Sequence, residues 1–236
     1  MRTLGSLKLY LVSDGLFRLD GGAMFGVVPK PLWVKAKPAD ERNRVTFGTN
    51  CLLIEAGSEL VLVDTGIGDK HDDKFLDIYA VDPRRTTLPE SIRAVGFDVG
   101  DVSHVVLSHL HFDHCGWNTR RDESGALVPT FPKARYWLER GEVDHGRAPT
   151  ERDRASYFPE NWEPLIEAGV AELFDGGGDG TEIVSGVRAV KAPGHNADMC
   201  VITLRAAARR ARSGPTSCRP SRTCRCPGSW RTTSIR

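Results

Sequence analysis

The sequence predicts a mixed α/β fold in which paired sheets are covered by outer helices. Apolar runs of strand length alternate with helical signals, and the strands group around tight turns as hairpins. The chain shows no internal repeat and no βαβ dinucleotide-binding unit. Its 236 residues, 40% hydrophobic and 27% charged, are typical of a soluble globular protein with a sizeable core.

The first strands and one long loop are predicted in the N-terminal third. LKLYLV (7–12) alternates and contains the residue types that strands favour, whereas residues 20–50 are rich in Gly, Pro and charge and predict a long ordered loop. NCLLIEAG and ELVLVDTGIGD then predict two strands with a hairpin turn at Gly57. The second strand ends at Asp64-Thr65-Gly66, where the chain must turn sharply.

Helices begin in the middle of the chain. Thr87-Leu88-Pro89-Glu90 predicts a capping box that opens a helix to about Val95. HVVLSH follows as a short buried strand, and ARYWLERGEV predicts a strand and then a helix. We expect these remaining elements, in order: a polar helix near 150–168, the strand GVAELF, a glycine-rich turn at 176–180, and strands near 182–192 and 199–205.

Charge is distributed unevenly along the chain. The net charge is +1, but residues 205–236 hold nine Arg and no acidic residue, so residues 1–204 carry 23 basic against 31 acidic side chains, a net −8. No apolar run approaches the roughly 20 residues that span a bilayer, and the N-terminus has no signal-peptide pattern. We therefore expect a cytoplasmic protein with no membrane partner. The six Cys form neither a disulfide framework nor a zinc-ribbon pair.

SHLHFDHCGW (108–117) contains a pattern that predicts a metal site. Neutral imidazoles and carboxylates are the ligands that zinc prefers, and a loop leaving a strand can direct His109 and His111 at one ion. Asp113 and His114 are then offset and could reach a second ion, so that two ions share a bridging hydroxide. The alternative is four polar residues on a surface turn, but the pattern is rare by chance and follows an apolar strand.

A further ligand must come from elsewhere in the chain. His195 in APGHNADM lies on a Pro-Gly turn between two predicted strands, which is a rigid place for a ligand. Alone it would be an ordinary loop residue. Next to the HxHxDH pattern we interpret it as a metal ligand.

VDTG (63–66), HLHFDH (109–114) and PGH (193–195), in this order, resemble the metallo-β-lactamase superfamily. The resemblance covers about residues 5–204 and implies an αββα sandwich, here with its C-terminal part incomplete. It implies a first Zn²⁺ on His109, His111 and His195, and a second on Asp113 and His114 together with a bridging Asp and one more His. Asp64 of VDTG would orient ligands, although it could also be a plain turn residue.

DGGAMFGVVPKPLW, ERNRV and VDTGIGDK resemble the branch of the superfamily that opens N-acyl homoserine lactones and quenches quorum sensing. The resemblance implies a hydrolase in which a metal-bound hydroxide attacks a carbonyl ester, most simply a lactone, while Asp113 holds or passes the proton. Thioesters, phosphoesters and organophosphates remain alternatives, because the fold hosts many reactions. We expect a small-molecule partner and no nucleic acid; the oligomeric state stays open.

Other candidate residues receive ordinary interpretations. His71, His104 and His145 are isolated and are expected to be surface or core histidines. Cys115 and Cys200 flank the site and are expected to be packing residues.

The segment 205–236 is anomalous. It contains no Asp, Glu or His, so it supplies neither the bridging Asp nor the last His that the resemblance implies. With free choice of synonymous codons, a shifted reading frame from Ser213 yields WADLVPTIAHLPLPWIMAYDLYP, whose ADLVPT resembles the bridging-Asp segment. We therefore interpret 1–204 as a truncated hydrolase domain and 205–236 as an out-of-frame, disordered basic tail. The chain would then be impaired, holding one ion rather than two, or would be a non-catalytic fragment that binds a single metal.

Overall fold

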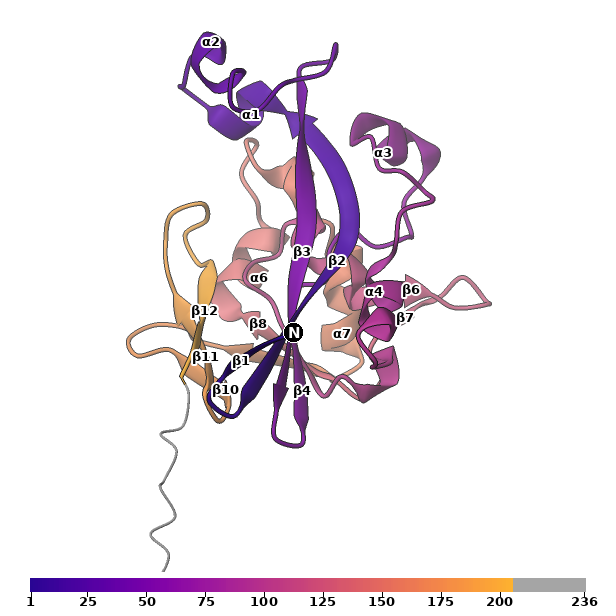
Figure 1. Ribbon diagram of the computed structural model, residues 1–236, viewed down its shortest axis with the longest axis vertical. Helices are drawn as coiled ribbons and strands as arrows, with labels where there is room; N and C mark the ends of the chain where they lie inside the picture. The colour runs from indigo at the N-terminus through magenta and orange to yellow at the C-terminus, as the bar shows by residue number, and fades with distance from the viewer. Residues whose placement is uncertain (206–236) are drawn as a thin grey trace, which may run out of the picture.

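The computed structural model describes residues 1–205, which form stacked layers of helices, a large sheet and a small sheet (Figure 1). The tail predicted to be out of frame and disordered is residues 205–236. All of it after Arg205 lies outside the described part of the chain. No helix among residues 1–205 is long and apolar enough to cross a membrane.

The large sheet has seven strands in the order β1-β2-β3-β4-β5-β8-β9. Strands β1 to β4 are antiparallel neighbours, whereas β4, β5, β8 and β9 run parallel to one another. The strands are β1 (Arg2–Leu4), β2 (Leu7–Asp20), β3 (Arg44–Ala56), β4 (Glu59–Val63), β5 (His104–Val106), β8 (Arg135–Glu139) and β9 (Ala171–Phe174).

Two smaller sheets complete the strand content of the described residues. One joins β10 (Thr181–Val184), β11 (Val187–Lys191) and β12 (Cys200–Leu204), and the other is the ribbon of β6 (Thr119–Arg121) and β7 (Leu127–Pro129). An apolar cluster that includes Ile54 and Val106 of the large sheet with Val187 and Ala189 of β11 fills the space between the sheets. Along the strands of both sheets, inward-facing side chains alternate with outward-facing ones, and the inward-facing apolar side chains form this cluster.

Helices pack on the other face of the large sheet. Leu88, Ile92, Val143 and Leu165 from three helices share one apolar cluster with buried strand residues such as Tyr136. The helices are α1 (Gly21–Phe25), α2 (Lys30–Trp33), α3 (Asp73–Ile78), α4 (Leu88–Ala94), α5 (Phe112–Cys115), α6 (Arg140–Arg147) and α7 (Glu163–Glu167), with 3-10 turns η1 (Val99–Asp101), η2 (Gly116–Asn118), η3 (Arg154–Ser156) and η4 (Pro159–Asn161). The capping box of Thr87 and Glu90 at the start of α4 is confirmed.

Three expectations from the sequence need correction. The predicted loop at 20–50 is wrong in part, because it contains α1 and α2 and because β3 already begins at Arg44 and pairs with the second half of β2. Figure 1 shows these two long strands extending beyond the rest of the sheet toward α1 and α2. The helix at 150–168 is broken into η3, η4 and the short α7, since Pro159 and Pro164 interrupt it.

The third correction concerns strand grouping. Hairpins account for β1 to β4 and for β10 to β12, but the parallel β4, β5, β8 and β9 are linked by crossovers. Parallel pairing requires such long connections, and the connection from β4 to β5 contains α3 and α4. Ligands in sheets of this kind gather at the carboxyl ends of the parallel strands, which is where VDTG and HLHFDH lie.

Candidate metal centre

Strand β5 delivers the chain to the histidine cluster. It lies between β4 and β8, and beyond its end the Leu107 N–H donates to the Trp137 carbonyl at 3.2 Å. Helix α5 then carries Asp113 and His114. We call residues 108–116 the histidine segment. Its backbone is fastened to the turn after β4, because the Thr65 N–H donates to the His114 carbonyl at 2.6 Å and the Gly116 N–H donates to the Gly66 carbonyl at 2.7 Å.

His195 comes from the turn between β11 and β12, residues 192–199, which we call the Pro-Gly-His turn. The turn is closed by the Ala192 N–H, which donates to the Met199 carbonyl at 2.8 Å. At its end the Cys200 N–H donates to the Ser108 carbonyl at 2.7 Å, which joins it to the histidine segment. Two stretches more than 80 residues apart are therefore brought to one place.

Three imidazoles meet there. One ligand atom from each of His109, His111 and His195 lies within 4.8 Å of the others, and no other group of three or more such side chains is found in residues 1–205. His195 Nε2 is 3.1 Å from His111 Nδ1. The ring centroids of His109 and His111 are 4.6 Å apart, and that of His195 lies 5.1 and 4.8 Å from them.

The cluster has the chemistry of a cation site. Nε2 of His109 and Nε2 of His111 are buried and have no hydrogen-bond partner among the described residues. Buried polar atoms without partners are uncommon, so convergent unpaired imidazole nitrogens fit a divalent metal ion. His195, by contrast, is exposed to solvent.

The protonation of the two buried imidazoles agrees with this chemistry. Burial, reinforced by His114 and the other histidines, holds the pKa of His109 far below its ordinary value. Burial and then His195 lower the pKa of His111 to about 3. Both rings are therefore neutral at pH 7, the form in which imidazole binds a metal.

Asp64 organises the second part of the predicted ligand set. Its carboxylate accepts hydrogen bonds from the Ser108 N–H at 2.7 Å and the Ser108 hydroxyl at 2.9 Å, and it lies 2.8 Å from His114 Nδ1. Burial disfavours charge on His114, but Asp64 and then Asp113 outweigh it and raise the pKa of His114 to about 9. The residue adopts φ +59°, a region that Asp tolerates better than most residues.

Asp113 lies beside His114, with Oδ2 3.5 Å from His114 Nε2. Burial raises the pKa of Asp113 above its ordinary value. Within residues 1–205, no third ligand side chain joins this pair at the separation that characterises the three-histidine cluster. The roles of Asp113, His114 and Asp64 toward a metal therefore stay predictions.

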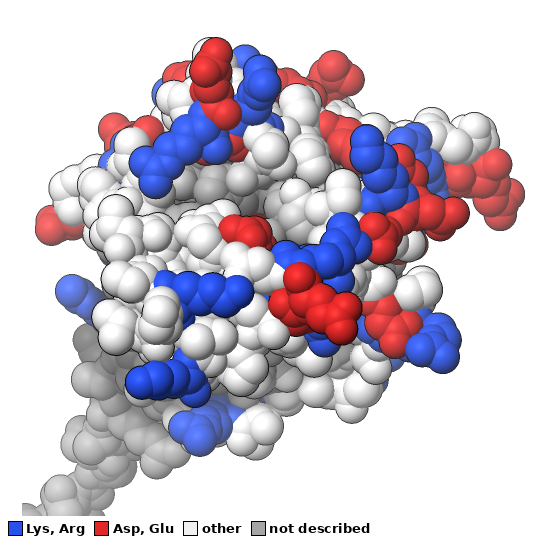
Figure 2. Space-filling view, turned by 90° about the horizontal axis from the view of Figure 1, so that it is seen from above, with Lys and Arg blue, Asp and Glu red and all other residues white. Residues whose placement is uncertain are grey.

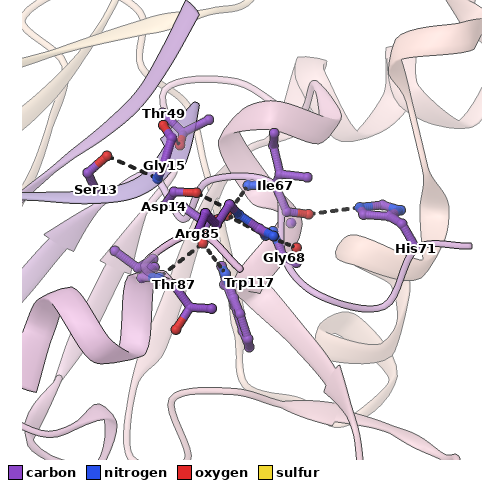
Figure 3. A network of polar contacts seen from close by, with 12 residues as sticks. Ser13, Asp14, Gly15, Thr49, Ile67, Gly68, His71, Arg85, Thr87 and Trp117 are labelled. Carbon is purple, nitrogen blue, oxygen red and sulfur yellow. Dashed lines mark hydrogen bonds and ion pairs between the residues drawn. The ribbon is translucent and has the colours of Figure 1, made fainter. Parts of the chain in front are cut away.

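A buried carboxylate on β2 supports the turn to which the histidine segment is fastened (Figure 3). Asp14 accepts hydrogen bonds from the N–H groups of Ile67 and Gly68 at 2.9 and 3.1 Å and from Trp117 Nε1 at 2.7 Å. The Leu88 N–H at the start of α4 also donates to it, at 2.9 Å, and Arg85 lies 3.4 Å away. Asp14 is fully buried, so these donors compensate its desolvation.

Among residues 1–205, the remaining histidines and the cysteines do not join the cluster. His71 Nε2 is 2.8 Å from the Ile67 carbonyl, Trp137 donates to His104, and His145 pairs with Asp153 at 2.7 Å. Cys115 and Cys200 are buried, in agreement with a packing role.

Five residues that contact the cluster, or hold the backbone around it, were not predicted from the sequence: Asp14, Ser108, Glu142, Tyr157 and Asn196. Ser108 and Asn196 directly neighbour predicted ligands, and this adjacency was the available signal. Asp14 and Glu142 are isolated carboxylates on other elements, and only their burial in the fold reveals their role.

The fold is a two-sheet α/β sandwich in which three histidines converge near the carboxyl end of the parallel strand β5. The family model described as Metallo-beta-lactamase superfamily matches residues 44–217. The chain therefore belongs to the metallo-β-lactamase superfamily, and the fold expected from the resemblance is confirmed.

Individual relatives are more distant. The chain is 29% identical over 199 residues to a probable metallo-hydrolase, Rv2300c, of Mycobacterium tuberculosis, covering 73% of this chain and 59% of that protein. It is 28% identical over 204 residues to the N-acyl homoserine lactonase AttM of Agrobacterium fabrum, covering 80% and 67%. The chain thus spans about 59% of the length of the mycobacterial relative.

Solved structures show the same fold. A probable metal-dependent hydrolase from Staphylococcus aureus superposes with a TM-score of 0.77 at 28% identity, covering 87% of this chain and 71% of that one. AidC, a dizinc quorum-quenching lactonase, superposes with a TM-score of 0.65 at 23% identity, covering 87% and 69%.

Proposed function

We propose that the chain is a metal-dependent hydrolase of carbonyl esters, with a lactone ring as its favoured substrate and Zn²⁺ as its favoured ion. The observation that carries the proposal is the meeting of His109, His111 and His195, with two buried imidazole nitrogens unpaired. Relatives named as N-acyl homoserine lactonases support the lactone as substrate.

His109, His111 and His195 would hold the ion. When bound, a divalent cation polarises a carbonyl oxygen and makes a coordinated water more acidic. The chain's own residues prepare the site: burial keeps His109 and His111 neutral, Asp64 fixes the orientation of His114, and Asp113 lies where it can hold a proton beside His114. His195 is exposed, so an ester can approach the cluster from its side.

Hydrolysis of an N-acyl homoserine lactone, followed as acid release in a weakly buffered solution with added Zn²⁺, tests the proposal. We expect only weak turnover by the chain, because residues 205–236 hold no Asp, Glu or His. We expect its loss with His111→Ala and little change with His104→Ala, because His104 pairs with Glu59 and Trp137 outside the cluster. Acid release that persists in His111→Ala or after chelation would refute a metal-dependent reaction.

A second candidate is a protein that binds one metal without turnover. It is favoured by the absence of a third ligand beside Asp113 and His114 in residues 1–205, and by the absence of Asp, Glu and His from residues 205–236 of the sequence. An activity assay distinguishes the two candidates. It compares the chain with a version in which the segment from Ser213 is replaced by WADLVPTIAHLPLPWIMAYDLYP. A gain of lactone hydrolysis in that version, with none in the chain, favours the single-metal candidate.

A further inference from the structure

The buried carboxylate of Glu142 links the two stretches that carry the three histidines. Glu142 lies in the first turn of α6 and is 1% exposed. Its Oε2 accepts the N–H of Leu110, the residue between His109 and His111, at 3.1 Å. Its Oε1 accepts Asn196 Nδ2, from the residue after His195, at 3.1 Å.

Tyr157 contacts both Glu142 and Asn196, and it also packs against one of the histidines. Its hydroxyl lies 3.4 Å from Glu142 Oε2 and accepts Asn196 Nδ2 at 3.0 Å. Its ring packs edge-on against His111, with centroids 4.9 Å apart and planes at 77°. Tyr157 is 4% exposed, so it contacts the ligand side chain and not solvent.

A second carboxylate at the start of α6 fastens the same turn. Glu139 accepts the Glu142 N–H at 3.1 Å and pairs with Lys191 at 2.8 Å, and Lys191 in turn pairs with Asp198 at 2.8 Å. Gly141 lies between them, where an added Cβ would come within 2.5 Å of Asp198 Cγ. The Pro-Gly-His turn therefore packs tightly against the first turn of α6.

We propose that Glu142 is a positioning residue that sets the separation of His195 from His109 and His111, and thereby the affinity of the site for a divalent cation. The inference depends on the proposed metal site. A carboxylate can accept from Leu110 and Asn196 at once because it has acceptor oxygens on both sides. Partners that hold metal ligands in place typically change metal affinity by about 10- to 100-fold.

Glu142→Gln tests the link with little change in shape. The amide oxygen can still accept the Leu110 N–H and the longer contact from Asn196 Nδ2 at 3.3 Å. The new NH₂ group replaces Oε1, so the shorter bond from Asn196 becomes a contact between two donors. We expect Co²⁺ affinity, measured by titration calorimetry, to fall by about 10-fold. We also expect the visible absorption band of bound Co²⁺ to change, because it reports coordination geometry.

Rescue separates positioning from a general loss of stability. In the double variant Glu142→Gln with Asn196→Asp, the Gln amide donates to the Asp carboxylate, and the total charge equals that of the original chain. We expect Co²⁺ affinity and the Co²⁺ spectrum to return toward those of the original chain. Asp144→Asn, an exposed carboxylate on the same helix, should leave both unchanged. If Glu142→Gln does not fold, Asn196→Ala removes the same link from the turn side and should weaken Co²⁺ binding similarly.

The outcomes distinguish the two proposals. Co²⁺ affinity and spectrum unchanged in Glu142→Gln or in Asn196→Ala would overturn the positioning role while leaving the metal site standing. A double variant no tighter than Glu142→Gln would overturn it as well. Failure of the original chain to bind Co²⁺ would overturn the metal site and the inference together.

Discussion

The two stretches that meet at the histidine cluster are held in different ways. The histidine segment follows a buried parallel strand, and its backbone bonds to the Thr65-Gly66 turn, while His109 and His111 are 4% and 9% exposed. The Pro-Gly-His turn has backbone bonds mainly within its own hairpin, and side chains of α6 and β11 attach it to the rest of the molecule. One half of the site is thus fixed by the core and the other by a few polar side chains.

Substitutions in the two stretches should therefore affect different properties of the protein. Changes that disturb the histidine segment should lower global stability, because its contacts belong to the main core. Changes that disturb the Pro-Gly-His turn should alter metal affinity more than stability. Side-chain links on a half-exposed turn contribute little to global unfolding.

The largest effect is expected for Gly116→Ala. An added Cβ would lie 1.8 Å from the Ile67 carbonyl oxygen, a backbone atom that cannot move without displacing the turn after β4. We expect the free energy of unfolding, measured by urea denaturation, to fall by about 3 kcal/mol. Gly100→Ala, where nothing lies within 4 Å of the added atom, is the matched control. Equal midpoints for the two variants would contradict the tight fit.

A smaller effect is expected from the buried ammonium of Lys70. It donates to the carbonyls of Gly116 and Thr119, just after the histidine segment, and burial lowers its pKa to about 8. The unfolded chain keeps the ordinary pKa of 10.5 and therefore takes up protons on unfolding between pH 8 and 10.5. Stability should accordingly rise with pH across this window, by about 2 kcal/mol between pH 7.5 and pH 10.

Lys70→Met supplies the comparison for that prediction. From pH 7.5 to pH 10, the free energy of unfolding measured by urea denaturation should rise more in the original chain than in the variant. The other titrating groups are common to both proteins, so the difference reports Lys70. A pH dependence that is identical in the two proteins would show that the Lys70 ammonium is not penalised by burial.

The smallest effect on stability is expected for Gly141→Ala. The added Cβ meets the side chain of Asp198, which can rotate, and Ala favours a helix over Gly by about 1 kcal/mol. We expect the free energy of unfolding to stay within about 1 kcal/mol. Co²⁺ affinity should fall, because a rotated Asp198 gives up its pair with Lys191, which helps to attach the Pro-Gly-His turn to the start of α6. A loss of stability as large as that of Gly116→Ala would remove the distinction between the two halves.

Much of the fold and the histidine cluster could be predicted from the sequence because the signals are local. HLHFDH and PGH are short, and the capping box at Thr87 is defined within four residues. The beginning of β3 at Arg44 could not be predicted, since that part of the strand pairs with β2 beyond the sheet body and is not apolar throughout. The parallel order of β4, β5, β8 and β9 depends on contacts between distant segments, which periodicity does not encode.

Glu142 shows the same limit within the site. Its sequence context, LERGEV, is that of an ordinary helix start with Glu139 as cap, and nothing local distinguishes it from the exposed Asp144. Only the packing of α6 against two distant loops gives its carboxylate donors from Leu110 and Asn196.

Acidic and basic side chains lie interleaved on the face of the molecule seen in Figure 2. Toward the lower left of that view, several basic side chains lie without acidic side chains beside them.

The carboxylate of Asp14 has a consequence for how the chain reaches its native state. Its donors come from positions 67, 68, 88 and 117, so no contiguous piece of the polypeptide can satisfy the charge by itself. A partly assembled intermediate would bury an anion with missing donors, an arrangement that is strongly disfavoured. Strand β2, the start of α4 and the stretch after the histidines should therefore assemble in a single cooperative event.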